Sequence, residues 1–214
     1  MSVEFRNSET KHNLIKAFAG ESQAVSRYTF AASQARSENL AVIQSVFLFT
    51  AGQEKEHAEI FYKFLKEFSG EKISGDGSYP VDIYKSTLEL LRASQNNEFD
   101  EYNHVYKDFA ETAKKEGFVK ISSTFDMISK IEKTHGNRFK HLADLLERQQ
   151  LFISDVETKW MCLNCGEVYE GKSAPLSCPV CSHNQGFFVR LELAPFTDAT
   201  GFSALSCANK RCVC

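Results

Sequence analysis

The feature of this 214-residue chain that most constrains its fold is a set of carboxylates in the middle of apolar rows. In each row the side chains recur every three or four positions, the spacing of the core-facing side of an amphipathic helix. The rows run through Leu14, Phe18, Glu21, Val25, Tyr28, Ala32 and Ala35, through Phe47, Thr50, Glu54, His57, Phe61, Phe64 and Phe68, and through Ile121, Phe125, Ile128, Glu132, His135, Phe139, Leu142 and Leu146. An ionised carboxylate buried alone is costly, so these rows predict helices that pack around a bound cation.

A fourth row follows the same spacing less regularly, through Leu91, Glu98, Glu101 and Val105. Residues 8–150 contain a single proline and long runs of strong helix formers. We therefore expect four helices, over residues 9–36, 39–68, 81–115 and 118–150. Two short links and one long glycine-rich connection would join them, which is typical of two helical hairpins linked by a crossover, as in ferritin-like bundles.

The carboxylates match in height between the helices of each hairpin. Glu21 and Glu54 lie equally far from the first expected turn, and Glu98 and Glu132 lie equally far from the second. Glu54 follows Glu21 by 33 residues, and Glu132 follows Glu98 by 34. The pattern indicates an internal duplication in which each half supplies one glutamate and one Glu-x-x-His motif.

The Glu-x-x-His motif alone is a weak signal, because it also ends at His12 and His104. These two histidines fall off the apolar rows, so we expect them to be solvated. His57 and His135 fall on the rows, beside the matched carboxylates. Position, and not the motif itself, therefore selects the candidate ligands.

Five carboxylates and two imidazoles suit two hard-to-borderline metal ions, and this ligand set is the one known from di-iron and di-manganese carboxylate bundles. The candidates are Glu21, Glu54, His57, Glu98, Glu101, Glu132 and His135. Glu54 and Glu132 would bridge the metals. Glu101 has no counterpart in the first half, so we expect one metal to be able to change ligands. The alternative, a buried polar network without metal, would leave the repulsion among five carboxylates without compensation.

All seven cysteines lie after residue 160, and four of them form the pattern C-x2-C-x12-C-x2-C. These four are Cys162, Cys165, Cys178 and Cys181. Two such knuckles can present four thiolates tetrahedrally, and Gly166 permits the tight turn of the first. The spacing indicates a metal but leaves structural zinc and redox-active iron both open. Residues 156–195 are turn-rich, so we expect a small β-rich module that its metal holds together.

Composition excludes several functions. The net charge of −3 gives no electrostatic basis for binding nucleic acid. No apolar run approaches the ~20 residues of a membrane span, and the polar N-terminal segment has no apolar core of a signal peptide. We therefore expect a cytoplasmic protein, and clustered cysteines in that reducing compartment favour metal binding over disulfides.

Several segments together resemble the rubrerythrin family. They are AFAGESQAVSRYTF (17–30), QEKEHAEIFYKFL (53–65), NEFDEYNHVYKDFAETAKKEGF (97–118), IEKTHGNRFKHL (131–142), and the WMCLNCG and CPVC motifs (160–166 and 178–181). The resemblance implies a mainly α fold: a ferritin-like di-iron bundle over residues 1–153, then a rubredoxin-like Fe(Cys)4 domain over 154–196. Residues 197–214 depart from the family pattern. This tail carries Cys207, Cys212 and Cys214, and we expect it to be a poorly ordered extension and not a redox appendage.

By this resemblance the seven bundle candidates are ligands of two non-haem irons, and the four cysteines hold a third iron. Zinc could substitute at either site. Glu101 and His57 would act catalytically by exchanging at one iron between the oxidised and reduced states. Tyr28 and Tyr102 match family tyrosines that hydrogen-bond around the di-iron site, although their spacing alone is equally consistent with core aromatics.

The resemblance also implies a function. The protein would be a peroxidase that reduces hydrogen peroxide in oxidative stress defence, with electrons from rubredoxin or an NAD(P)H-dependent reductase arriving through the cysteine-bound iron. The family pattern is a homodimer. One alternative is a ferroxidase or iron-handling protein that uses the same di-iron site. Another is a zinc-ribbon binding module fused to an inert bundle. Iron storage needs no reductant during mineralisation, so the cysteine module favours the peroxidase.

Overall fold

The computed structural model describes residues 3–195, so the expectations for the tail at 197–214 and its three cysteines lie outside the described residues. The chain divides into two compact units, Met1–Arg148 and a second that begins at Gln149. The first is helical, and the second contains the described strands. The division falls a few residues before the boundary expected from the sequence, where the last long helix ends.

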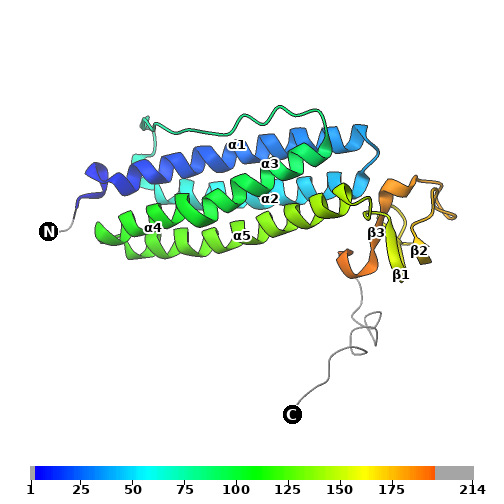
Figure 1. Cartoon of the computed structure of the whole chain (residues 1–214). Coiled ribbons are helices and arrows are strands. Elements are labelled where there is room, and N and C mark those ends of the chain that lie inside the picture. Colours follow the sequence, from blue (N-terminus) through cyan, green and yellow to red (C-terminus); the bar gives the residue numbers. More distant parts are fainter. Residues whose placement is uncertain (1–2, 196–214) are drawn as a thin grey trace, which may run out of the picture. The chain divides into compact units, whose positions relative to one another are not determined.

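The first unit is an antiparallel helical bundle (Figure 1). Its helices are α1 (Glu9–Ser37), α2 (Ala41–Phe64), α3 (Thr87–Asp100), α4 (Tyr106–Lys115) and α5 (Val119–Glu147). α1 packs on α2, and both α3 and α4 pack on α5. The turns that close the two pairs contain Asn39 at φ 59° and Gly117 at φ 92°, residue types that tolerate this conformation. None of the described helices is long and apolar enough to cross a membrane.

Two layers of aromatic rings fill much of the bundle interior: Tyr28, Phe47 and Phe139 in one, and Phe61, Tyr106 and Phe125 in the other. Ring centroids lie 5.1–6.0 Å apart within the first layer and 4.9–5.9 Å apart within the second. All six side chains are at most 2% exposed. Because α2 and α5 contribute to both layers, the stretch of each helix between the layers is held in a dry, fixed position.

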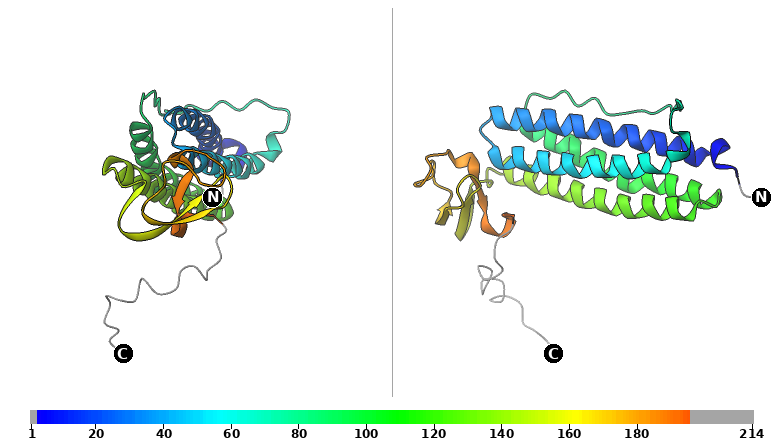
Figure 2. Two further views of the ribbon diagram at one scale, coloured as in Figure 1. Left: turned by 90° about the vertical axis from the view of Figure 1, so that its right-hand side faces the viewer. Right: turned by 180° about the vertical axis from the view of Figure 1, so that it is seen from behind.

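The crossover between α2 and α3 runs over the outside of the bundle along α1 (Figures 1 and 2). It is attached at several points. The hydroxyl of Tyr79 donates to the carbonyl of Lys16 at 3.2 Å. The carboxylate of Asp82 pairs with Arg27 at 3.1 Å and accepts from the amide of Asn97 at 2.8 Å. The crossover is therefore tied to both α1 and α3.

The expectation of a third helix from residue 81 is wrong, because α3 begins at Thr87. Ser86 is its N-cap: the hydroxyl accepts from the N–H of Glu89 at 3.3 Å and donates to the Glu89 carboxylate at 2.7 Å. A capped N-terminus of this kind ends the helix at Ser86. The preceding residues instead stay in the crossover.

A one-turn π-helix interrupts the third helix at Glu101–Val105. Its signature is the N–H of Tyr106, which donates to the carbonyl of Glu101, five residues earlier. A π-turn adds one residue to a helix and rotates all that follows, and such turns are frequent at functional sites. The helix expected over 81–115 is therefore two α-helices, α3 and α4, in different registers.

The second unit is a three-stranded antiparallel sheet in the order β2–β1–β3. Its strands are β1 (Ile153–Cys162), β2 (Val168–Ser173) and β3 (Phe188–Arg190). Its buried cluster consists of Trp160, Cys162, Ala174, Cys178 and Phe188. The indole N–H of Trp160 donates to the carbonyl of Gly171 at 2.9 Å. Because two members of this cluster are thiols, the part of the unit that the structure describes has little apolar interior apart from its cysteine site.

Candidate metal centres

Six of the seven predicted bundle ligands meet in the middle of the helices. They form two groups, in each of which one N or O atom per residue lies within 4.8 Å of the others. The groups are Glu21, Glu54, His57 and Glu132, and Glu54, Glu98, Glu132 and His135. Glu54 and Glu132 belong to both groups, as expected of carboxylates that bridge two metals. All six residues are at most 5% exposed.

The ligand atoms lie within ion-pair distance of one another but without regular hydrogen-bond geometry. His57 Nδ1 lies 2.9 Å from Glu54 and 3.0 Å from Glu132, and His135 Nδ1 lies 2.8 Å from each of the same carboxylates. Nevertheless both nitrogens and all four of these carboxylate oxygens lack a hydrogen-bond partner. Buried polar atoms are almost always hydrogen-bonded. Ligand atoms that converge in this way without hydrogen bonds to one another therefore fit a pair of metal ions.

Two buried tyrosines hold the outer carboxylates. The hydroxyl of Tyr28 donates to Glu98, and that of Tyr106 donates to Glu21 at 2.5 Å. Each tyrosine thus reaches the glutamate of the other half of the bundle. Tyr28 follows Glu21 by seven residues and Tyr106 follows Glu98 by eight, and the π-helix supplies the extra residue. The same insertion explains why the two glutamates of the second half are 34 and not 33 residues apart.

The structure corrects the expectation for Tyr102. Its partly buried ring lies between Lys107 and Lys133, whose Nζ atoms are 4.6 and 5.0 Å from the ring centroid, and its hydroxyl accepts from Lys133 at 3.5 Å. The π-helix directs this residue away from the ligands and brings Tyr106 to them. Sequence reasoning missed Tyr106 because regular helical spacing does not place it on the apolar row of Glu98.

Burial and mutual charge set the protonation of the metal-free site. Burial, followed by repulsion from Glu54, raises the pKa of Glu98 to about 8. For the two histidines burial opposes the proton, but the bridging carboxylates outweigh it. They raise the pKa of His57 to about 9 and that of His135 to about 12. The metal-free site therefore holds extra protons, which bound metal ions would displace.

His135 is also held from outside the site. Its Nε2 lies 3.1 Å from the amide oxygen of Gln53, which accepts from Arg138 at 3.0 Å, and Arg138 donates to Thr50 at 2.8 Å. This contact fixes the ring and leaves Nδ1 for a metal. Across residues 3–195, no corresponding hydrogen bond holds Nε2 of His57, so the two histidines differ in how firmly they are fixed.

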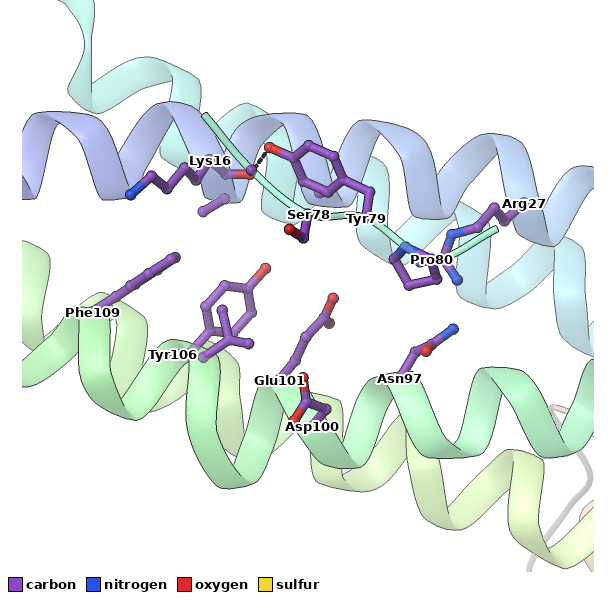
Figure 3. Close-up of a pocket in the computed structure, with 14 residues that line it drawn as sticks. Lys16, Arg27, Ser78, Tyr79, Pro80, Asn97, Asp100, Glu101, Tyr106 and Phe109 are labelled. Atoms are coloured by element: carbon purple, nitrogen blue, oxygen red, sulfur yellow. Dashed lines mark hydrogen bonds between the residues drawn. The ribbon is translucent and has the colours of Figure 1, made fainter. Parts of the chain in front are cut away.

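The seventh predicted ligand, Glu101, stands apart from both groups. It begins the π-helix, and its partly buried carboxylate points into a cavity between α1 and α3–α4 (Figure 3). Burial, followed by repulsion from Glu98 and Glu132, raises its pKa well above the usual value. The charges of Glu98 and Glu132 thus affect the pKa of Glu101, although Glu101 belongs to neither ligand group.

Among the described residues, the remaining four histidines belong to none of the groups of candidate metal ligands. His104 is exposed and pairs with Asp100 at 2.8 Å, and His141 is exposed as well. His12 is partly buried on α1. His183, near the cysteines, packs its ring on Phe187 with centroids 4.5 Å apart. The two histidines on the apolar rows are therefore the ones that lie in the ligand groups of the described residues.

The four predicted cysteines converge in the second unit, with all four sulfurs within 4.8 Å of one another. The Sγ atoms of Cys162 and Cys181 lie 3.7 Å apart, and those of Cys165 and Cys178 lie 3.6 Å apart. A disulfide requires about 2.05 Å. A tetrahedral metal with bonds of about 2.3 Å separates its sulfurs by about 3.8 Å. The sulfurs therefore fit one tetrahedral metal ion.

The two cysteine knuckles have matching turns. Gly166 and Ser182 each follow a cysteine directly, with φ of 80° and 61°. Their N–H groups donate to the carbonyls of Cys162 and Cys178 at 2.8 and 2.9 Å. At Cys181, the backbone N–H of the second residue after it lowers the pKa of the thiol to about 6. The backbone thus stabilises the thiolate of Cys181. At Cys165 the N–H of Glu167 acts in the same direction, but burial and the neighbouring thiols outweigh it and raise the pKa to about 12.

Comparison with known proteins agrees with both sites. The rubrerythrin family model matches residues 12–143, and the model of the rubrerythrin rubredoxin-like domain matches residues 160–189. A rubrerythrin of Clostridium perfringens is 44% identical over 86% of this chain and 94% of its own length. One of Porphyromonas gingivalis is 44% identical over 88% and 92%. The chain belongs to the rubrerythrin family. Its ferritin-like and rubredoxin-like parts, expected from the sequence, are thereby confirmed.

Solved structures show the same fold as this rubrerythrin-family chain. A fully reduced, all-ferrous nigerythrin has a TM-score of 0.58 and 25% identity, and the match covers 89% of this chain and 88% of that one. A bacterioferritin of Desulfovibrio desulfuricans has a TM-score of 0.58 over 66% and 82%, but at 19% identity it supports the bundle fold alone. Together with the donor atoms described above, family membership indicates iron at a carboxylate–histidine site and at a tetracysteine site.

Proposed function

We propose that this protein is a non-haem di-iron peroxidase that reduces hydrogen peroxide to water in oxidative stress defence. The O–O bond breaks, and two electrons and two protons convert one peroxide into two water molecules. The observation that carries the proposal is the presence in one chain of a buried carboxylate–histidine site and a rubredoxin-like tetracysteine site. The first suits oxygen chemistry, and the second suits one-electron transfer.

Six residues of the bundle would bind the two irons. Glu54 and Glu132, which belong to both ligand groups, would hold both irons. Glu21 and His57 would complete the ligands of one iron, and Glu98 and His135 those of the other. When bound, the irons supply one electron each, which matches the two electrons that one peroxide consumes. The hydroxyls of Tyr28 and Tyr106 orient the outer carboxylates, and the aromatic layers on both sides keep water out.

Glu101 and His57 would serve catalysis by alternating as ligands on one side of the site. His57 lies within a ligand group, and Glu101 lies just outside it. Among the described residues, Gln53 holds the Nε2 of His135, and no equivalent group holds His57. This asymmetry supports exchange on the His57 side. If Glu101→Ala retained full peroxide turnover, the exchange would be wrong.

The tetracysteine iron would receive electrons from rubredoxin or an NAD(P)H-dependent reductase in the cytoplasm and pass them to the di-iron site. Zinc in its place would carry no electron. We also propose a homodimer. Large apolar side chains exposed on the bundle support it, including Phe30 at 71%, Phe49 at 60% and Met127 at 57% exposure.

Reaction of the full-length, iron-loaded protein with peroxide and with oxygen tests the proposal. After anaerobic reduction, stopped-flow mixing should show the di-iron site oxidised faster by hydrogen peroxide than by oxygen. A ferroxidase, the principal alternative, would react faster with oxygen and would go on to oxidise added Fe(II). Zinc that persists at the cysteine site after iron-replete expression would contradict the electron-transfer role.

A further inference from the structure

The geometry points to the cavity beneath the crossover as the route by which substrate reaches the di-iron site, and to short alkyl hydroperoxides as substrates beside hydrogen peroxide. This inference rests on the proposed peroxidase function and adds an access route and a substrate class to it. The O–O bond of an alkyl hydroperoxide would break, and the same two electrons and two protons would give one alcohol and one water molecule. The cavity lies between α1 and α3–α4, and the crossover segment Ser78–Pro80 covers it (Figure 3).

The inner wall of the cavity belongs to the di-iron site. Glu101 and Tyr106 line it, and Figure 3 shows both side chains pointing into the space. The hydroxyl of Tyr106 also donates to the ligand Glu21. The six grouped ligands are at most 5% exposed, so a substrate has to pass a neighbouring side chain to reach them. Glu101 is the predicted ligand that this cavity exposes.

The size and lining of the cavity suit a small amphipathic guest. Its volume is about 360 Å³, roughly twelve times the ~30 Å³ that a water molecule occupies in the liquid. Polar Asn97 and Arg27 line it together with apolar Phe109 and Pro80. The side chains of Asn97 and Arg27 could donate to a hydroperoxide group, while a short alkyl chain would contact the apolar part of the wall.

The roof of the cavity is fixed on the C-terminal side of Ser78. The hydroxyl of Tyr79 donates to the carbonyl of Lys16, and further along Asp82 is held by Arg27 and Asn97. The cavity is therefore a lasting feature of the fold. Ser78 is exposed, and its side chain points toward the space. A large side chain there should narrow the cavity without displacing a helix.

Substitution of Ser78 tests the route, with Ser74 as a matched control. Both serines are exposed in the crossover, but Ser74 does not line the cavity. Reduced, iron-loaded full-length protein is mixed with hydrogen peroxide or tert-butyl hydroperoxide in a stopped-flow instrument. The wild type should react with both. Ser78→Phe should lower the second-order rate constant about tenfold for the alkyl hydroperoxide, and less for hydrogen peroxide, whereas Ser74→Phe should match the wild type.

Azide binding to the oxidised protein gives a measurement that involves no turnover. A narrowed route lowers the association and dissociation rate constants by the same factor and leaves Kd unchanged, whereas damage to the site changes Kd. If Ser78→Phe left the peroxide and azide rates unchanged, or if Ser74→Phe slowed them equally, the route would be overturned. A wild type inert to tert-butyl hydroperoxide would overturn the substrate class.

Azide binding also allows the access route and the proposed peroxidase function to be tested independently. A wild type that fails to reduce either peroxide, but whose azide association slows in Ser78→Phe, would refute the peroxidase function and retain the route. Rapid peroxide reduction that is unaffected by Ser78→Phe would retain the function and refute the route. Equal melting temperatures for the wild type and the two variants would establish that the fold is intact.

Discussion

The two metal sites of this chain depend on their surroundings in opposite ways. The bundle ligands lie between two layers of buried aromatic rings, and none of those rings belongs to a ligand. In the second unit, Cys162 and Cys178 are themselves part of the buried cluster, together with Trp160, Ala174 and Phe188. The bundle therefore has a hydrophobic core that does not depend on bound metal. In the cysteine unit, part of the buried cluster consists of the metal ligands themselves.

This difference shows how the length of a domain determines how much a bound metal contributes to its stability. Four long helices bury enough apolar surface to hold costly carboxylates at fixed positions before metal arrives. A short three-stranded sheet cannot do so, and metal binding supplies much of its folding free energy. We therefore expect metal to occupy a preformed site in the bundle and to fold the cysteine unit.

Loss of one thiolate should give the largest effect. Cys178→Ser should abolish metal binding in the second unit and unfold it, because structural metal binding contributes about 10–16 kcal/mol to comparable small modules. The bundle should keep its helices and its irons. Metal analysis and amide NMR of the full-length chain would report both outcomes. Dispersed amide signals from a metal-free second unit would contradict the comparison.

Loss of a bridging carboxylate should remove metal from the bundle without unfolding it. Glu54→Ala should release iron from the bundle, since Glu54 belongs to both ligand groups. The helices should remain, because the aromatic layers do not include this residue. Circular dichroism and iron content of the purified protein measure the two quantities separately. A bundle that loses its helical signal together with its iron would show that the site is not preformed.

Loss of a supporting hydroxyl should weaken the bundle site without emptying it. Tyr106→Phe removes the hydrogen bond to Glu21 and should lower iron affinity about 10–100-fold, as is usual for groups that orient ligands. Tyr102→Phe is the matched control, because its hydroxyl contacts Lys133 and not a ligand. Competition with a chelator measures both affinities. A greater loss for Tyr102→Phe would refute the assignment of the tyrosines.

The stability of the metal-free bundle should fall as pH rises. The pKa of Glu98 increases from 4.5 to about 8 in the fold, and that of His57 from 6.5 to about 9. Each folded-state pKa lies above the unfolded one, so the stability it contributes is present at low pH and is lost as pH rises through the folded value. Metal-free protein should melt lower at pH ~9 than at pH ~6. The metal-loaded bundle should show a weaker dependence, and a metal-free melting point that rises over this interval would contradict the expectation.

Two helical glycines should give the smallest effects and test packing alone. A Cβ at Gly136 would lie 2.8 Å from the ring of Phe99, whereas a Cβ at Gly52 would meet nothing within 4 Å. Gly52→Ala should stabilise the bundle by about 1 kcal/mol through helix propensity. Gly136→Ala should be less stable than Gly52→Ala by about 1–3 kcal/mol because it overpacks the contact between α5 and α3. Urea unfolding of the metal-free protein would measure the difference.

The grouped ligands were predictable from sequence because a carboxylate in an apolar helical row has few physical explanations. Glu54 was predicted at the height of Glu21, and Glu132 at the height of Glu98. The structure places Glu54 and Glu132 in both ligand groups. Tyr106 was not predictable, because it reaches the site only through the π-helix. The spacings of 33 and 34 residues contained the signal, but one extra residue is equally compatible with a longer turn.

Other features lay outside what the sequence could specify. Residues 81–86 have no strong helix breaker after Pro80. The cap at Ser86, the contacts of Asp82 and the hydrogen bond from Gln34 to the carbonyl of Lys85 keep them out of the helix. At the cysteine site, the spacing predicted four converging thiolates but not the metal, because zinc and iron accept the same tetrahedron. The family comparison, and not the spacing, favours iron there.

The central claim is that electrons pass from the tetracysteine iron to the di-iron site and then to peroxide. The most direct test mixes fully reduced, iron-loaded protein with excess hydrogen peroxide and follows the visible absorption of ferric thiolate. We expect this colour to appear after oxidation of the di-iron site, with more than one peroxide consumed per chain. A cysteine site that stays reduced and colourless beside an oxidised di-iron site would contradict the claim.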